Sequence, residues 1–203
     1  AGENPFFTEW DTPHGVPPFD KILPEHFMPA FERGMSLHEA EIDAITSNKD
    51  EATFENTILA YDNAGQMLAQ TELVFGMLCA AETNDRMQAL QEQAMPLLAA
   101  HRDKIRLDDK LFVRVKEVYD RRAALGLDAE QMRLLQKTYD SFVRAGALLD
   151  AEQKARLKEI NGQLSLTAVK FGNNILAENN NFVLELKSDE LDGLPAGIRD
   201  AAR

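Results

Sequence analysis

The chain has 203 residues and a formal net charge of −12, with 44% hydrophobic and 28% charged residues. This composition is ordinary for a globular protein that builds its own hydrophobic core. The acidic excess repels phosphate backbones, so we expect no nucleic acid partner. A single cysteine, Cys79, excludes an internal disulfide framework and a multi-cysteine metal site, and we expect it to be a small buried hydrophobe on a helix.

The chain shows neither of the common membrane-targeting signals. No apolar run approaches the roughly 20 residues of a membrane-spanning helix, so we expect no membrane span. Residues 1–20 contain Pro, Asp, Glu and Trp and do not resemble a signal peptide. A precursor whose leader had been removed would look the same, and the sequence therefore assigns no compartment. Nor does it decide whether Ala1 and Gly2 are a remnant of expression.

The first predicted element is an extended, irregular arm at residues 4–23. Six of the eight prolines fall within residues 4–29, and each fixes φ and removes a backbone donor. Large apolar side chains in the same stretch would be costly to leave in water, so we expect the arm to lie across the helices as a strap. These side chains are Phe6, Phe7, Trp10, Phe19 and Ile22.

Helical periodicity dominates residues 24–180. Apolar residues recur at spacings of three and four, which predicts a series of amphipathic helices. Thr53, Asn84 and Asp128 are predicted N-caps, and both Asp128 and Asp150 are followed three residues later by a Gln, as in a capping box. Before residue 150 the predicted helices are 24–47, 53–83, 84–105, 108–125 and one that begins at Asp128.

The longest predicted helix covers residues 150–180. Its apolar residues fall on one side, and we expect that side to pack against the preceding helices as a spine. They are Leu157, Ile160, Leu164, Ala168, Phe171 and Ile175.

The pattern changes after residue 181. Residues 182–187 are rich in β-prone side chains and predict a lone short strand, whose ladder partner would lie outside this chain. Residues 194–203 look like the first turns of a helix without a C-terminal cap, and residues 181–203 are therefore expected to be a strand followed by a truncated helix. The predicted fold class is all-α, a multi-helix antiparallel array with the proline-rich arm and this one strand.

No complete catalytic or metal-binding motif is present. His-Glu-Ala-Glu-Ile at residues 38–42 approaches His-Glu-x-x-His, but Ile42 stands where the second zinc ligand belongs. We therefore interpret His38 and Glu39 as solvated residues on a helix surface. The remaining histidines, His14, His26 and His101, are scattered and have no second ligand one turn away. The residues alone predict no catalytic group and no metal ligand, and they leave the substrate-binding residues unknown.

An ordered series of short segments carries a resemblance to one protein family. Thr-Phe-Glu-Asn-Thr at residues 53–57 is the most specific of them. Others are Asn-Pro-Phe-Phe at 4–7, Gly-Val-Pro-Pro-Phe at 15–19, Pro-Glu-His-Phe at 24–27, Lys-Leu-Phe-Val-Arg-Val at 110–115 and Phe-Gly-Asn-Asn at 171–174. Together they resemble the N-terminal region of the thimet oligopeptidase and peptidyl-dipeptidase family of zinc metallopeptidases, and within it most nearly the bacterial peptidyl-dipeptidases.

The resemblance implies a role for the chain. Members of the family are mostly helical shells around a deep channel, in which one zinc ion serves the hydrolysis of short peptides; peptidyl-dipeptidases release dipeptides from a free C-terminus. The zinc motif of the family lies several hundred residues beyond the matched region, so no catalytic or metal residue is carried over to this chain. Residues 1–203 would be the N-terminal, non-catalytic helical domain of a larger enzyme, inactive alone.

In that enzyme the chain would form one wall of the channel. Its partners would be the missing C-terminal catalytic domain and short peptide substrates, and zinc would be present only in the full-length parent. In a bacterium the compartment would be the cytoplasm or the periplasm. The alternative is a free-standing helical scaffold or protein-interaction module without peptidase activity.

Overall fold

The computed structural model describes residues 3–187 and 190–201; Ala1 and Gly2, and with them the question of a remnant, lie outside the described residues. The described residues are mostly helical and contain no strand, which confirms the all-α fold class. The chain divides into two compact units, Ala1–Val169 and Lys170–Arg203, and α7 begins in the first and ends in the second. The helices are α1 Phe27–Ser47, α2 Ala60–Asp62, α3 Gln66–Ala81, α4 Asp85–Arg106, α5 Asp109–Asp120, α6 Ala129–Arg144, α7 Ala151–Asn181 and α8 Ala196–Ala201.

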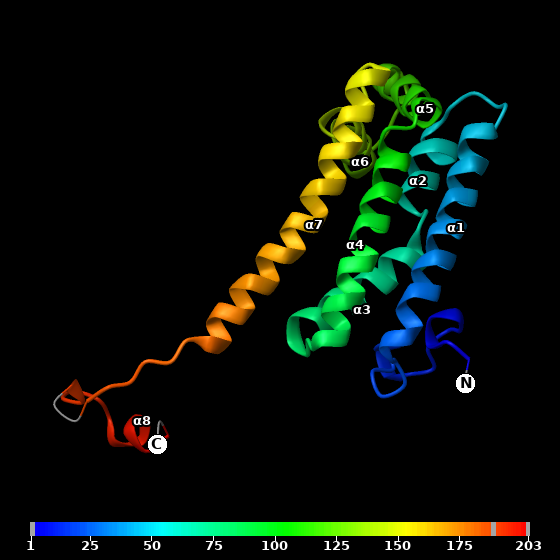
Figure 1. The fold of residues 1–203 in the computed structure, drawn as a ribbon. Coiled ribbons are helices and arrows are strands. Elements are labelled where there is room, and N and C mark those ends of the chain that lie inside the picture. Colours follow the sequence, from blue (N-terminus) through cyan, green and yellow to red (C-terminus); the bar gives the residue numbers. More distant parts are fainter. Residues whose placement is uncertain (1–2, 188–189, 202–203) are drawn as a thin grey trace. The chain divides into compact units, whose positions relative to one another are not determined.

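The first unit is built around α1. Figure 1 shows the chain running along α1, returning through α2 and α3, and running back along α4. α1 packs against α3, α4 and α5, and α5 packs against α6. The antiparallel sequence of helices follows from short connections, which place consecutive helices side by side.

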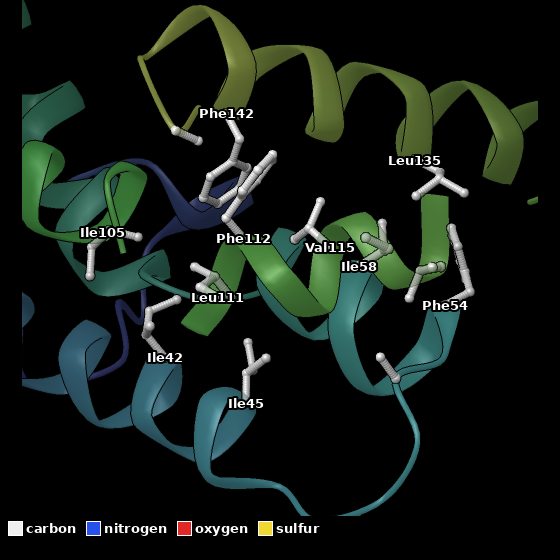
Figure 2. Close-up of a cluster of buried hydrophobic side chains, with 13 residues drawn as sticks. Ile42, Ile45, Phe54, Ile58, Ile105, Leu111, Phe112, Val115, Leu135 and Phe142 are labelled. Carbon is white, nitrogen blue, oxygen red and sulfur yellow. The ribbon is translucent and has the colours of Figure 1, made fainter. Parts of the chain in front are cut away.

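Two buried apolar clusters fill this unit. The arm cluster joins the N-terminal arm to one half of α1, α3 and α4; it consists of Phe6, Ile22, Phe27, Ala30, Phe31, Leu68, Val74, Phe75, Met87, Ala94 and Leu98. The α5–α6 cluster joins the other half of α1 to α5, α6 and the end of α4 (Figure 2); it consists of Ile42, Ile45, Ala52, Phe54, Ile58, Ile105, Leu111, Phe112, Val115, Val118, Leu135, Phe142 and Ala147.

The arm packs on the helices as a strap, in short 3-10 turns at Pro5–Phe7 and Pro13–Gly15. Phe6 and Ile22 are buried, and the ring of Phe6 lies 5.3 Å from that of Phe27, between ring centroids. Phe19, by contrast, is exposed. Cys79 on α3 is half-buried and packs against the arm cluster, and burial raises the pKa of its thiol.

The predicted N-caps are confirmed. The backbone N–H groups of Asn56, Met87 and Gln131 donate to Thr53 Oγ1, Asn84 Oδ1 and Asp128 Oδ1 at 3.1, 3.0 and 2.8 Å, respectively. The reciprocal bonds of a capping box are also present at Thr53 and Asp128. Each cap satisfies a donor that the first helical turn leaves free.

The prediction of one helix over residues 53–83 is wrong. The segment begins with a π-helical turn, Phe54–Leu59, continues as α2 and breaks before α3 at Gly65, where φ is +75°. A left-handed residue ends a helix, and glycine adopts that conformation without the penalty that a Cβ imposes. The break redirects the chain so that α3 packs on α1.

The predicted spine role of residues 150–180 is wrong, although the helix itself is confirmed as α7. Within the first unit only Lys154 and Val169 of α7 are buried, while Ile160 is 43% exposed and Leu164 is 62% exposed. The buried apolar side chains of the earlier helices pack on one another in the two clusters, and neither cluster includes a residue of α7.

The predicted strand at residues 182–187 is also wrong. These residues form neither strand nor helix, and residues 3–187 and 190–201 contain no strand to pair with them. β-prone side chains do not make a strand without a partner that supplies the ladder hydrogen bonds. The predicted helix near the C-terminus is present as α8, up to Ala201.

Candidate functional site

A polar layer lies between the two apolar clusters. On α1, His38 follows Phe31 of the arm cluster and precedes Ile42 of the α5–α6 cluster. On α4, His101 stands in the same way between Leu98 and Ile105, which belong to the arm cluster and the α5–α6 cluster, respectively. The layer therefore sits where α1 and α4 pass from one cluster to the other.

Four side chains of this layer form a chain of contacts. His38 Nδ1 and His101 Nε2 lie 3.0 Å apart, a hydrogen bond between two imidazoles. The other ring nitrogen of His101, Nδ1, lies 3.6 Å from Glu39 Oε1, and Lys104 Nζ lies 2.8 Å from Glu39 Oε2. His101 is only 5% exposed, and its Nδ1 has no partner within hydrogen-bond distance among the described residues. The interpretation of His38 as solvated is wrong, because it is half-buried and hydrogen-bonds His101, whereas the side chain of Glu39 is 37% exposed and stays at the surface.

The break at Gly65 fits around His38. A Cβ at Gly65 would lie 2.9 Å from His38 Nδ1, so only glycine leaves room for the imidazole there. The backbone N–H of Gly65 donates to Glu41 Oε2 at 2.7 Å, which ties the start of α3 to α1. Glycine is therefore favoured at position 65 for two reasons: it adopts the left-handed backbone conformation without strain, and it leaves room for the imidazole of His38.

Burial controls the charge of the two imidazoles. It lowers the pKa of His38, with a further lowering from the charge of His101 and opposing effects of Glu41 and Glu39. Burial likewise lowers the pKa of His101, against the raising effect of Glu39. The hydrogen bond from Lys104 is the main reason that the pKa of Glu39 is lowered. Both imidazoles therefore favour their neutral forms.

A small hollow opens beside this layer. Its volume is about 180 Å³, and its polar lining includes His38, His101, Tyr61, Glu72 and Arg102. Burial raises the pKa of Glu72, although Arg102 Nη1 lies 3.9 Å from Glu72 Oε2.

The layer does not fit a zinc ion. The described residues contain no group of three or more His, Cys, Asp or Glu side chains that could hold a metal. The two nitrogens of His38 and His101 point at each other rather than at a common point, so they hydrogen-bond instead of converging as ligands. Elsewhere His26 Nδ1 accepts from the N–H of Leu23 at 3.1 Å, a contact at a helix start, and His14 is exposed.

The segment Thr53–Thr57, the most specific part of the resemblance, has a structural role. Arg114 on α5 donates to the carbonyl oxygens of Asn48 and Asp50 and to Oδ1 of Asn56, each at 3.1 Å. The same Asn56 Oδ1 also accepts from the Thr53 N–H at 2.8 Å. The segment therefore fixes the loop after α1 and holds α5 against it.

Among the residues that the structure describes, no helix is both long and apolar enough to span a membrane. Sequence reasoning missed the polar layer because 63 residues separate its two histidines, and no local spacing relates them. The available signal was a histidine at a core-facing position of each of two predicted helices.

The known proteins that are similar to this chain include a dipeptidyl carboxypeptidase and oligopeptidases. The chain is 41% identical over 176 residues to a dipeptidyl carboxypeptidase of Escherichia coli (strain K12), a match over 87% of this chain and 26% of that protein. It is 24% identical over 193 residues to oligopeptidase A of the same organism, covering 95% of the chain and 28% of the relative.

A thimet-like oligopeptidase of Dictyostelium discoideum is 24% identical over 175 residues, 84% of the chain and 25% of the relative. The chain thus spans about a quarter of the length of the curated relatives it matches. No protein-family model matches it.

Proposed function

We propose, on the premise that this chain belongs to the family of the dipeptidyl carboxypeptidases and oligopeptidases, that it is the non-catalytic N-terminal helical portion of a zinc metallopeptidase. The helices of the first unit would form one wall of a channel that admits short peptides and excludes folded proteins. The parent enzyme would hydrolyse such peptides and release dipeptides from their C-terminus. Zinc would be held by other parts of that enzyme, since the described residues of this chain do not fit it.

The unpacked side of α7 is the observation that carries the proposal. Within the first unit Ile160 and Leu164 are exposed, and within the second unit Phe171 and Ile175 are exposed as well. Groups of exposed apolar side chains are typical of interaction surfaces rather than of free protein surfaces. Since the match covers 26% of the dipeptidyl carboxypeptidase, the remaining polypeptide of the peptidase is the occupant that this surface supports.

A peptidase assay on the product of the complete gene tests the proposal. We expect that product to contain zinc and to release C-terminal dipeptides, with activity lost in a chelator and restored by zinc. The 203-residue chain alone, assayed in parallel, should have no such activity. Chelator-sensitive hydrolysis by the chain alone would contradict a non-catalytic role. A gene product that ends with this chain would instead favour the free-standing scaffold.

A further inference from the structure

The contact between His38 and His101 constrains how many protons the layer can hold. At 3.0 Å, one hydrogen fits between Nδ1 of His38 and Nε2 of His101. Two neutral imidazoles meet this condition, and so does a pair in which only one ring is charged. When both rings are protonated, two N–H groups face each other, and the hydrogen bond becomes a repulsion between two cations.

We propose that His38 and His101 form a proton-operated latch, which joins α1 to α4 at the boundary between the two apolar clusters and releases them when both rings are protonated. The latch is independent of the role proposed for the chain in a peptidase. It rests on the 3.0 Å contact, on the burial of His101 and on the position of both rings between two clusters.

The surrounding charges set how readily the pair accepts protons. Acidic groups near the pair are Glu39 and Glu41 on α1, and they favour protonation. Glu72 on α3 lines the same hollow, and burial raises its own pKa. Basic groups on α4 oppose it, and Lys104 also holds one oxygen of Glu39 away from His101. These basic groups are Lys104 and Arg102. Arg106 on α4 and Tyr61 on α2 also line the hollow.

The direction of the pH effect follows from the lowered pKa of each ring. In the unfolded chain a histidine has its ordinary pKa of 6.5, whereas burial lowers the folded values of both rings. Below pH 6.5 the unfolded chain therefore binds protons that the folded chain does not. The stability that the neutral pair contributes is fully present above pH 6.5. It is lost as the pH falls below 6.5 and through the two lower pKa values of the folded chain.

Protonation of both rings is expected to separate α1 from α4 locally before the whole chain unfolds. α1 and α4 are each anchored at both ends by an apolar cluster, so repulsion at the layer separates them in the middle. Gly65 lies against His38, and the start of α3 is therefore expected to loosen together with this part of α1 and α4.

Titration of the imidazoles by NMR, with ¹⁵N-labelled histidine in the full chain, tests the latch between about pH 8 and pH 5. We expect His38 and His101 to titrate in two coupled steps, both below the ordinary value of 6.5. Amide hydrogen exchange, corrected for its intrinsic pH dependence, should rise across the middle of α1 and α4 during the second step. The folding equilibrium constant should fall by about tenfold for each pKa unit of depression found.

His38→Asn is the decisive variant, because its amide nitrogen takes the place of Nδ1 and its oxygen can accept once His101 is protonated. We expect this variant to keep α1 and α4 protected in acid. His14→Asn, the same substitution at an exposed histidine, should leave the wild-type behaviour unchanged.

Independent single-step titrations of the two rings would overturn the latch. So would equal loss of protection in His38→Asn and in the wild type. Should His38→Asn fail to fold, the coupled titration and the exchange of the wild-type chain decide the question by themselves.

Discussion

Arg114 shows how one buried cation organises a loop. Its guanidinium is held by two backbone carbonyls of residues 48–50 and by the side chain of Asn56, and the residue is only 9% exposed. Charged donors make stronger hydrogen bonds than neutral ones, and the acceptors lose their partners together if the side chain is removed. The loop after α1 depends on this side chain for satisfying its carbonyl groups.

Arg114→Ala is therefore expected to lower the free energy of unfolding by about 2–4 kcal/mol, because three acceptors lose a charged donor. Urea denaturation followed by circular dichroism measures this change. Arg133→Ala, at an exposed arginine of α6, is the matched control and should change stability by less than about 0.5 kcal/mol. Equal effects of the two substitutions would show that the contacts of Arg114 contribute nothing specific.

Substitutions at Gly65 and Gly126 distinguish the cost of backbone strain from the cost of a steric clash. Both have positive φ, +75° and +64°, but a Cβ at Gly65 would press on His38, whereas nothing lies within 4 Å of a Cβ at Gly126. Gly126→Ala should lose about 1–2 kcal/mol from the left-handed backbone alone. Gly65→Ala should lose more, by the cost of displacing His38, in the same unfolding measurement. A smaller loss at Gly65 than at Gly126 would mean that His38 moves freely.

At the scale of elements, helix starts were the most predictable feature. A cap depends on two residues three positions apart, as for Asp128 and Gln131, so a local pattern contains the whole signal. The break before α3 was not predictable, because Gly65 interrupts an apolar periodicity that continues on both sides. Its cause is the fit against His38 and Glu41, which come from another helix.

Asp128→Ala should lower the free energy of unfolding by about 0.5–2 kcal/mol, because the N–H of Gln131 loses its acceptor. Asp128→Asn keeps an acceptor at the same place and should cost much less. Thermal unfolding of both variants gives the comparison. If Asn were as costly as Ala, the charge of Asp128 at the start of α6, and not its hydrogen bond, would be the main contribution.

At the scale of the whole molecule, periodicity predicted which residues share a face but not what covers that face. The apolar sides of α1 and α6 lie in the clusters, whereas Ile160 and Leu164 on α7 remain exposed within the first unit. The apolar residues of α7 recur at the same spacings of three and four as those of α1 and α6. The candidate site was missed for a related reason, since only the packing of α1 on α4 brings His38 to His101.

Leu164→Ala should leave the unfolding of the 203-residue chain within about 0.5 kcal/mol of the wild type, because the side chain is 62% exposed. Leu135→Ala, at a fully buried leucine of α6, should cost about 2–5 kcal/mol. In a longer polypeptide that covers α7, Leu164→Ala should become destabilising too. A large cost in the 203-residue chain would show that this side of α7 is already packed.

The histidine pair also determines the register of two helices. Sliding α1 along α4 by one turn, about 5.4 Å, would move each imidazole into an apolar cluster and leave it without a partner. An unpaired buried polar group costs about 1–3 kcal/mol, so the shifted alignments are disfavoured even though isoleucine, leucine and phenylalanine side chains would tolerate them. The two side chains that weaken the molecule in acid therefore specify, at neutral pH, which turn of α1 meets which turn of α4.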